Sequence, residues 1–146
     1  TQVADLFAGD GNFALPLGRL GHEVLALEAD PKAVPAGKKN AARPGLNQVR
    51  FKRYDLARPE ALGQQMQKEK VRAAIVDPPR TGGGRKLAAA LDVPSLQRLV
   101  WVSCDVVNTC RDLAPFLAQG WQIRSMHLYD LFPQTWHVET VFVLER

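Results

Sequence analysis

The chain has 146 residues, of which 46% are hydrophobic and 23% charged, so its length suits one domain around a single core. No apolar run approaches the roughly 18 residues needed to cross a bilayer, which argues against a membrane-spanning role. Nineteen Lys and Arg against fifteen Asp and Glu give a net charge of +4, which is compatible with a polyanionic partner but does not require one.

The start of the chain and its cysteines indicate its setting. The sequence opens in an apolar segment, TQVADLF, with neither an initiator Met nor a signal sequence, so we expect residues 1–146 to be one domain of a longer protein. Cys104 and Cys110 are six residues apart, a spacing typical of neither a disulfide framework nor a zinc site. We therefore expect reduced thiols, no metal and a cytoplasmic protein, and no obligate protein partner is evident.

Short apolar runs alternate with longer amphipathic stretches up to about residue 120. This alternation is typical of parallel βαβ units. The predicted strands are 3–7, 23–28, 49–55, 72–77 and 98–103, and the predicted helices are about 12–20, 31–43, 59–68, 84–92 and 108–119.

The last 26 residues follow a different pattern. WQIRSMHLYDLFP and HVETVFVLER are two strand-like segments with a short connection, which suits an antiparallel pair because parallel strands need a long crossover. This order of elements predicts an α/β, Rossmann-like fold of the S-adenosylmethionine-dependent methyltransferase type, with a seven-stranded, mostly parallel sheet and a C-terminal antiparallel hairpin. A plain dinucleotide-binding domain would lack that hairpin.

The first predicted strand enters the first helix through DLFAGDGNF, with Gly9 and Gly11 in the turn. In doubly wound sheets a ligand approaches the carboxyl ends of the strands at such a turn, and glycine lets the ligand lie against the backbone. The third glycine of the GxGxxG pattern is replaced by Ala14. The turn alone is therefore weak evidence for a nucleotide site, and an ordinary βα loop would explain it as well.

Carboxylates end the second and third predicted strands. Glu28 lies sixteen residues after Asn12, where a carboxylate can accept both hydroxyls of a ribose. Because Asp30 and Pro31 already suit the N-cap and first turn of the next helix, we expect Glu28 to be free for a ligand. Asp55 ends the third strand at the same edge and is either a contact for an adenine amino group or an ordinary surface aspartate.

The fourth predicted strand ends in VDPPRTG. Its two prolines fix φ and remove two backbone donors, so Asp77 should be extended with its side chain directed off the strand end. Methyltransferases that act on exocyclic amines carry an aromatic residue after a related Asp/Asn-Pro-Pro, whereas Arg80 follows here, and amine methylation loses support. The alternative is that the prolines only shape a turn.

Cys104 ends the fifth predicted strand at the same edge. A free cysteine is often a small buried residue, and the pattern alone favours that interpretation. Arg111 is one residue too far from Cys104 for the Cys-x5-Arg loop of phosphatases. Near the C-terminus, alternation places His137 and Glu139 on one face of a strand, where a surface strand end would equally explain a Glu.

DLFAGDGNF, DPPRTG, VSC and DLFPQTWHVETVFVLER, in this order and spacing, resemble the RNA uridine-5-methyltransferases, which make 5-methyluridine in transfer or ribosomal RNA. The similarity covers nearly the whole chain and corresponds to the C-terminal catalytic domain of that family, without its N-terminal RNA-binding barrel and central domain. The resemblance therefore implies that residues 1–146 are an S-adenosyl-L-methionine-dependent catalytic domain whose partner is an rRNA or tRNA substrate.

The resemblance also implies roles for individual residues. Carbon 5 of uracil is a weak nucleophile, so a thiolate adds at carbon 6. Cys104 corresponds to that nucleophile and Glu139 to the general base that removes the proton from carbon 5 after methyl transfer. The positions that match cofactor-binding residues of the family are Phe7, Asn12, Glu28, Asp55 and Asp77. A uridine in folded RNA would have to be flipped out to reach the thiol.

The chain departs from the family directly after the nucleophile. The family usually reads Asn-Pro with a threonine two residues later, whereas residues 105–108 read DVVN. We expect the charge of Asp105 to disfavour a thiolate at Cys104, and the loss of proline to loosen the loop. Arg111 and Asp112 still match the family pattern.

Three functions are therefore compared. The first is a uridine methyltransferase that acts through Cys104 and Glu139. The second is a catalytically silent module that keeps the cofactor fold and binds cofactor, RNA or both. The third is a nicotinamide-dependent oxidoreductase, which the incomplete glycine pattern and the terminal hairpin disfavour.

Overall fold

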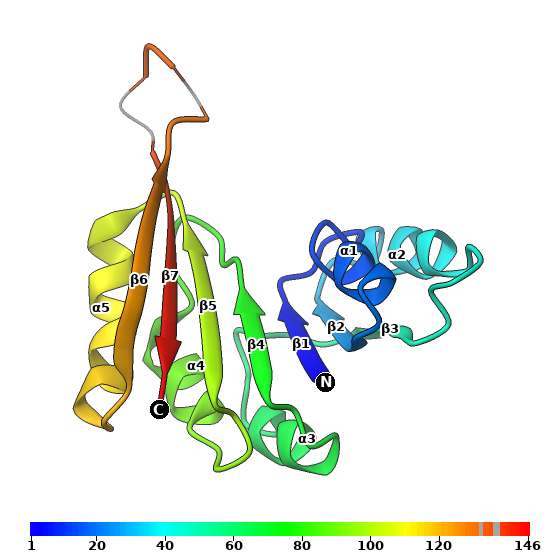
Figure 1. Ribbon diagram of the computed structural model, residues 1–146, viewed down its shortest axis with the longest axis horizontal. Coiled ribbons are helices and arrows are strands. Elements are labelled where there is room, and N and C mark those ends of the chain that lie inside the picture. Colours follow the sequence, from blue (N-terminus) through cyan, green and yellow to red (C-terminus); the bar gives the residue numbers. More distant parts are fainter. Residues whose placement is uncertain (132, 136–137) are drawn as a thin grey trace.

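The computed structural model describes residues 1–131, 133–135 and 138–146. These residues form a seven-stranded sheet in the order β3-β2-β1-β4-β5-β7-β6, with helices on its two faces (Figure 1). The strands are β1 (Gln2–Leu6), β2 (Glu23–Glu28), β3 (Val49–Arg53), β4 (Ala73–Val76), β5 (Arg98–Ser103), β6 (Gln122–Tyr129) and β7 (Glu139–Glu145). The helices are α1 (Ala14–Arg19), α2 (Ala33–Ala41), α3 (Leu62–Lys68), α4 (Gly84–Leu91) and α5 (Val106–Ala118).

The pairing of the strands confirms the predicted sheet. Strands β1 to β5 run parallel to one another, and β7 is inserted between β5 and β6, antiparallel to both. Strands β2 and β5 have the bounds that the sequence predicts, whereas α1 begins at Ala14 rather than at residue 12. Phe13 is the N-cap of α1, and residues 9–13 form the turn that precedes the helix.

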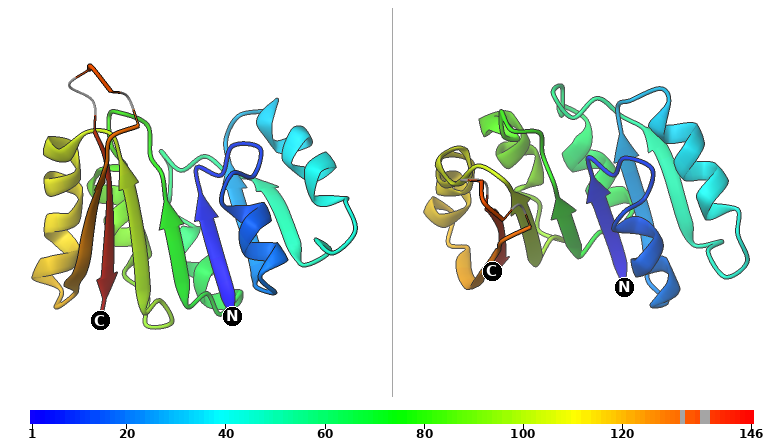
Figure 2. Two further views of the ribbon diagram at one scale, coloured as in Figure 1. Left: turned by 45° about the horizontal axis from the view of Figure 1, so that its top comes forward. Right: turned by 90° about the horizontal axis from the view of Figure 1, so that it is seen from above.

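Alternating side chains divide the core into two layers. In β2, Val24 and Ala26 pack with residues of α1 and α2, whereas Leu25 and Leu27 pack with residues of α3, α4 and α5. Figure 2 shows α1 and α2 at the β1–β3 end of the sheet and α3 to α5 on the opposite face. The near-continuous apolar runs in the sequence are therefore those of strands buried on both faces.

The sheet is covered unequally along its width. On the face that carries α1 and α2, no helix in the described part of the chain lies over β4, β5 and β7 (Figure 2). The side chains that point to this face are only half-buried: Ile75, Val100, Val102, Val141 and Val143. In the described residues, no helix has the length and apolarity required to cross a bilayer.

Aromatic packing fixes α5 against the sheet. Trp101 of β5 is fully buried and meets the ring of Phe116 of α5 edge-on, with 6.3 Å between centroids. Phe116 also packs edge-on against Trp121 at 5.8 Å. Pairs of this geometry contribute roughly 0.5–1.5 kcal/mol each beyond the buried area. The two elements that flank Cys104, β5 before it and α5 after it, are thus held in a fixed relation.

Candidate active site

The candidate residues gather at one edge of the sheet. Strands β1, β2, β4 and β5 end there, and the antiparallel β7 starts there (Figure 1). Phe7 follows β1, Asp77 follows β4 and Cys104 follows β5, while Glu28 is the last residue of β2 and Glu139 the first of β7. This is the edge at which parallel α/β sheets bind their ligands.

The turn after β1 has an unusual backbone. Phe7 has a φ of 63° and Gly9 a φ of 56°, in the left-handed region that residues other than glycine rarely adopt. At Gly11 an added Cβ would lie 2.8 Å from Leu15 Cγ and 3.0 Å from Phe51 Cζ, so only glycine fits. Strain of this kind is typical of ligand-binding turns.

Glu28 is not free, contrary to the expectation from sequence. Its Oε2 accepts a hydrogen bond from the amide of Gly9 at 2.9 Å, and Oε1 accepts from the amides of Ala29 at 2.7 Å and Asp30 at 2.8 Å. Asp30 itself accepts from the amide of Lys32 at 2.7 Å, as its predicted turn role requires. Glu28 therefore shapes the glycine turn, and its Oε2 keeps one lone pair for a further donor.

Asp5 is a residue of this edge that sequence reasoning missed. It lies within β1, is 0% exposed, and neither carboxyl oxygen has a hydrogen-bond partner in the described residues. Burial raises the pKa of Asp5 to about 7, the Ala14 amide lowers it in part without reaching hydrogen-bond geometry, and repulsion from Asp77 and Glu28 raises it further. The available signal was a charged residue inside an apolar run.

A hollow of about 440 Å³ brings three of the predicted residues together. Its polar lining comes from Asn12, Asp77, Tyr129 and Glu139, which belong to four separate segments of the chain. Its apolar lining is Phe13, Ile75, Val100, Val102, Leu131 and Val141. A volume of this size falls within the roughly 300–1,000 Å³ of small-molecule sites.

The charges in this hollow influence one another. The pKa of Asp77 is raised, first by burial and then by repulsion from Glu139. Asp77 and Glu139 are therefore near neighbours although they come from β4 and β7, on either side of β5. Two carboxylates that face one hollow suit a cationic ligand or a proton-transfer step.

The predicted nucleophile and the predicted base lie at the same end of the β5–β7 pair. Ser103 pairs with Thr140, and the Thr140 hydroxyl donates to the Ser103 carbonyl at 2.9 Å. Cys104 and Glu139 are the next residues beyond this last pair, but Cys104 lines a separate hollow with Leu128 and Val138 rather than the hollow of Asp77 and Glu139. Cys104 is a half-buried free thiol. His137, which the sequence places on the same strand face as Glu139, lies outside the described residues.

Asp105, the residue after Cys104, caps α5. Its Oδ1 accepts from the amide of Asn108 at 3.0 Å, and its Oδ2 accepts from Asn108 Nδ2 at 3.1 Å. The Ser103 hydroxyl accepts from the amide of Asp105 and donates to its carbonyl, both at 3.0 Å. Asp105 and Asn108 thus supply a cap at this point, where negative charge is favoured at a helix N-terminus, and the expected loosening by the loss of proline stays a prediction.

The loop that follows Asp77 is attached to the same helix. Asn108 Nδ2 also donates to the carbonyl of Arg80 at 2.9 Å, and Arg111 Nη2 donates to the carbonyl of Thr81 at 2.9 Å. Because α5 begins two residues after Cys104, these bonds connect the loop after Asp77 with the loop that holds the thiol.

Asp112 completes this attachment from inside the protein. It is 0% exposed, and its Oδ2 accepts from the amides of Gly83 at 2.7 Å and Gly84 at 3.2 Å. Arg111 Nε donates to its Oδ1 at 2.9 Å. The first amides of α4 thus bind an internal carboxylate, in the manner of an anion-binding nest. We use "loop clamp" for the hydrogen bonds between residues 80–84 and the side chains of Asn108, Arg111 and Asp112.

Asp55 does not join the other candidates. It is exposed, and its Oδ1 accepts from the amide of Ala57 at 3.0 Å in a turn of its own. Arg58 lies 3.9 Å away as an exposed ion-pair partner, an arrangement that contributes little to stability. Asp55 lines none of the hollows found at this edge in the described residues.

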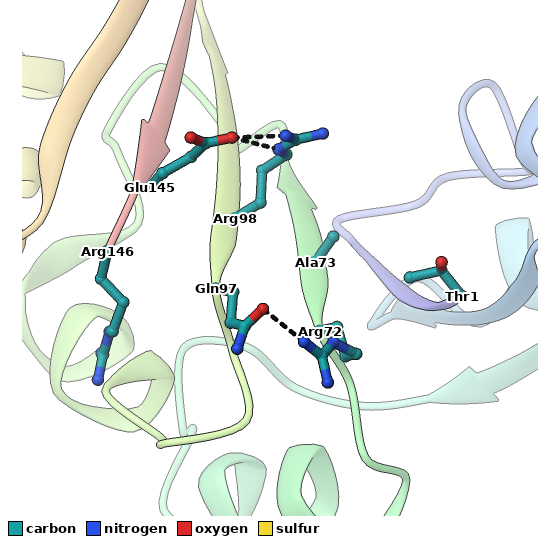
Figure 3. Close-up of a pocket in the computed structure, with 7 residues that line it drawn as sticks. All are labelled: Thr1, Arg72, Ala73, Gln97, Arg98, Glu145 and Arg146. Carbon is teal, nitrogen blue, oxygen red and sulfur yellow. Dashed lines mark hydrogen bonds and ion pairs between the residues drawn. The ribbon is translucent and has the colours of Figure 1, made fainter.

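A further hollow, of about 320 Å³, lies at the opposite edge of the sheet (Figure 3). Its cationic side chains already have partners: Arg98 contacts Glu145 at 2.5 Å, Arg72 donates to Gln97 at 2.5 Å, and Arg146 contacts Asp92 at 2.6 Å. It is lined by residues near the amino ends of the parallel strands, away from the ligand-binding edge. We therefore assign the candidate site to the edge with Asp77, Cys104 and Glu139.

Comparison with solved structures defines the class of protein. An S-adenosylmethionine-dependent methyltransferase from Methanosarcina mazei superposes with a TM-score of 0.73 at 12% identity, over 99% of this chain and 92% of that chain. The crystal structure of Pyrococcus abyssi tRNA (uracil-54, C5)-methyltransferase in complex with S-adenosyl-L-homocysteine superposes with a TM-score of 0.77 at 26% identity, over 97% of this chain and 33% of that chain. The fold is therefore that of the S-adenosylmethionine-dependent methyltransferases, as predicted.

Sequence comparison defines the family. The family model for tRNA (uracil-5-)-methyltransferase matches residues 1–146, so the chain belongs to that family. Two 23S rRNA (uracil(1939)-C(5))-methyltransferases RlmD, from Shewanella sediminis and Marinomonas posidonica, are 38% and 36% identical over 144 residues. In both comparisons the alignment covers 99% of this chain and 32% of the relative, so the chain spans about a third of the length of these relatives.

Proposed function

We propose that the protein to which this chain belongs methylates carbon 5 of a uridine in RNA, with S-adenosyl-L-methionine as methyl donor and a covalent adduct at Cys104. The observation that carries this proposal is the register of β5 and β7, which ends at the pair Ser103–Thr140 and so leaves Cys104 and Glu139 as the next residues of the two segments at the edge of the sheet. Glu139 also faces Asp77 and Asn12 across one hollow. Family membership supports the same reaction.

The chain's own residues suit the steps of this reaction. The Cys104 thiolate would add to carbon 6 of the uracil, and the electron pair displaced onto carbon 5 would take the methyl group of the donor, whose sulfur–methyl bond would break to leave S-adenosylhomocysteine. Glu139 would then remove the proton from carbon 5, and the returning electron pair would expel the sulfur of Cys104.

The acidic groups of the edge fit the proposed cofactor. S-adenosyl-L-methionine would supply a methyl group on a positively charged sulfur, and it also carries an ammonium group and a ribose. Asp5 is buried without a partner in the described residues, Asp77 lines the hollow, and Glu28 retains one open acceptor position on Oε2. These are the acceptor and charge properties that a cationic nucleoside requires, and we propose Phe7 and Asn12 of the glycine turn as further contacts. Asp55 would require a rearrangement of its turn to take part.

The proposed substrate is ribosomal or transfer RNA. The curated relatives act on 23S rRNA by their names, and the solved relative on tRNA, so the family supports both. We also propose a cytoplasmic location, because Cys104 must remain a free thiol for the reaction and cytoplasmic thiols are kept reduced.

The second candidate function is a silent module that binds cofactor or RNA without catalysis. The residues after Cys104 favour it, because they differ from those usual in the family. The structure weakens this argument, since Asp105 and Asn108 form a complete cap at this point. The nicotinamide-dependent alternative has no remaining support, because the chain belongs to a methyltransferase family.

Trapping tests the proposal. The full-length protein is incubated with S-adenosyl-L-methionine and cellular RNA in which 5-fluorouridine replaces uridine, because fluorine at carbon 5 cannot leave as a proton and the adduct persists. We expect a covalent protein–RNA band that Cys104→Ala abolishes, a loss of about 1,000-fold or more. Cys110→Ala is the matched control, since Cys110 is an exposed thiol six residues away and its loss should leave the band intact. No adduct and no methyl transfer to any cellular RNA would favour the silent module.

A further inference from the structure

Three cations on the segment from residue 80 to 86 have no charged partner. Arg80, Arg85 and Lys86 are all exposed, and none of them is in an ion pair within the described residues. Some exposed arginines elsewhere are in ion pairs, as Arg50 is with Glu69 at 2.7 Å and Arg98 with Glu145 at 2.5 Å, whereas others, such as Arg19 and Arg43, are in none within the described residues. The positive charge of this segment is therefore available to a partner.

The hydrogen-bond network ties the backbone of this segment to the start of α5, next to the candidate nucleophile. The carbonyl of Arg80 accepts from Asn108, and the same amide group donates to Asp105, the residue after Cys104. Arg85 lies in the first turn of α4, whose first amide binds Asp112. A polyanion whose nucleotide reaches Cys104 would thus meet these cations next.

The loop that carries the cations is constrained. Gly82 and Gly84 have φ values of 83° and 78°, which favour glycine, and a Cβ on Gly82 would collide with Asp112. The loop clamp holds residues 80–84 at four points. A surface that is ordered in advance loses less conformational entropy on binding.

The same geometry decides which groups would recognise an anion. The amides of Gly83 and Gly84 already bind the buried carboxylate of Asp112, so the glycine turn cannot cradle a phosphate with its backbone. The unpaired guanidinium groups remain, and arginine is well matched to phosphate oxygens. Lys86 lines a different hollow together with Glu60, so we assign no role to it.

We propose that Arg80 and Arg85 form a phosphate-binding surface for the RNA strand that carries the target uridine. This inference rests on the proposed function, since it assumes an RNA partner. It assigns the backbone contact next to the thiol to the loop between β4 and α4. Such contacts position the strand without reading its sequence.

Salt-dependent binding tests this surface in the full-length protein. The probe is a short fluorescent oligouridylate, followed by anisotropy between about 50 and 200 mM salt. We expect Arg80→Ala and Arg85→Ala each to weaken binding about 10-fold and to reduce the slope of log affinity against log salt by about 0.7. The matched control is Arg43→Ala, which removes the same charge from an exposed residue beyond the C-terminal end of α2; it should change affinity less than about 2-fold.

The lysine variants distinguish phosphate binding from stacking on a base. Arg80→Lys and Arg85→Lys should retain the salt slope and most of the affinity, because a lysine still binds phosphate as a point charge. An unchanged slope in the alanine variants, or an effect equal to that of Arg43→Ala, would overturn the proposal. Binding is measured without turnover, and affinity for S-adenosylhomocysteine should be the same in all variants, so failure of this surface is distinguishable from failure of the trapping experiment.

Discussion

The two halves of the sheet are built differently. At the β1–β3 end, helices cover both faces, and this half contains the strained turn at Phe7, the buried Asp5 and the glycine that tolerates no side chain. At the β4–β7 end, the described residues place helices on one face only (Figure 2). This half carries Cys104, Glu139 and the loop clamp. Tight packing therefore accompanies the proposed cofactor contacts, whereas the proposed chemistry with RNA is placed where the sheet is open.

Asp5 gives the largest stability effect expected from this difference. Its carboxyl has a pKa of about 7 in the folded protein against 3.8 in the reference state. Folding therefore takes up a proton between these pH values, and the free energy of unfolding should fall as pH rises from about 4 to about 7 and then level off. The full penalty above pH 7 is about 4 kcal/mol, at roughly 1.4 kcal/mol for each pH unit.

The substitution Asp5→Asn should remove this dependence. Relative to the parent protein, the variant should gain about 4 kcal/mol of stability between pH 4 and pH 8. Urea unfolding at several pH values, followed by the fluorescence of the buried Trp101 and Trp121, measures the difference. If the stability of the two proteins depends on pH alike, Asp5 is ionised throughout. In that case burial of Asp5 at the β1–β3 end of the sheet does not lower the free energy of unfolding.

A substitution at Gly11 tests the packing at the β1–β3 end of the sheet directly. Gly11→Ala must place a Cβ against Leu15 and Phe51 at a φ of 114°, so we expect a loss of about 2–4 kcal/mol from overpacking and backbone strain together. Gly21→Ala is the matched control, because Gly21 has a φ of 84° but nothing within 4 Å of an added Cβ. It should lose only about 1 kcal/mol.

The same pair of variants separates stability from ligand binding. If the turn is shaped for a cofactor, Gly11→Ala should also weaken S-adenosylhomocysteine binding in calorimetry at temperatures where the variant is still folded. Gly21→Ala should leave that affinity unchanged, since Gly21 lies beyond the C-terminal end of α1, away from the turn. Equal losses of stability in the two variants would show that the packing around Phe51 is looser than the structure indicates.

Prediction from the sequence was most successful for features that the hydrophobic pattern and the connection lengths determine. Apolar alternation predicted the strands, and the short terminal connection predicted the antiparallel pairing of β7. Prediction failed where the result depended on which group a side chain turns toward. The charge of Asp105 was visible in the sequence, but the turn of its carboxylate toward Asn108 was not. Likewise Glu28 was expected to be free, although its position at a strand end also lets it bind the amide of Gly9.

The burial of Asp5 and Asp112 was not foreseen for a related reason. The burial of a residue depends on which elements pack over it. The sequence shows an acidic residue but does not show which elements pack over that residue. Asp112 matched the family pattern, yet its role as the anchor of the first amides of α4 needs the contact with Gly83 and Gly84, almost thirty residues earlier in the chain. Such contacts depend on the packing of α4 against α5.

The smallest expected effect concerns the open half, at the residue where the chain departs from its family. Asp105→Ala removes the cap of α5 and should cost about 1 kcal/mol of stability, whereas Asp105→Asn keeps an acceptor for the Asn108 amide and should cost less than about 0.5 kcal/mol. Thermal unfolding measures both.

The trapping rate adds a separate readout: if the charge of Asp105 hinders the thiol, Asp105→Asn should form the 5-fluorouridine adduct faster than the parent protein. Because the Asp105 carboxylate is bound by two donors of Asn108 at a helix N-terminus, we expect the two rates to agree within about 3-fold.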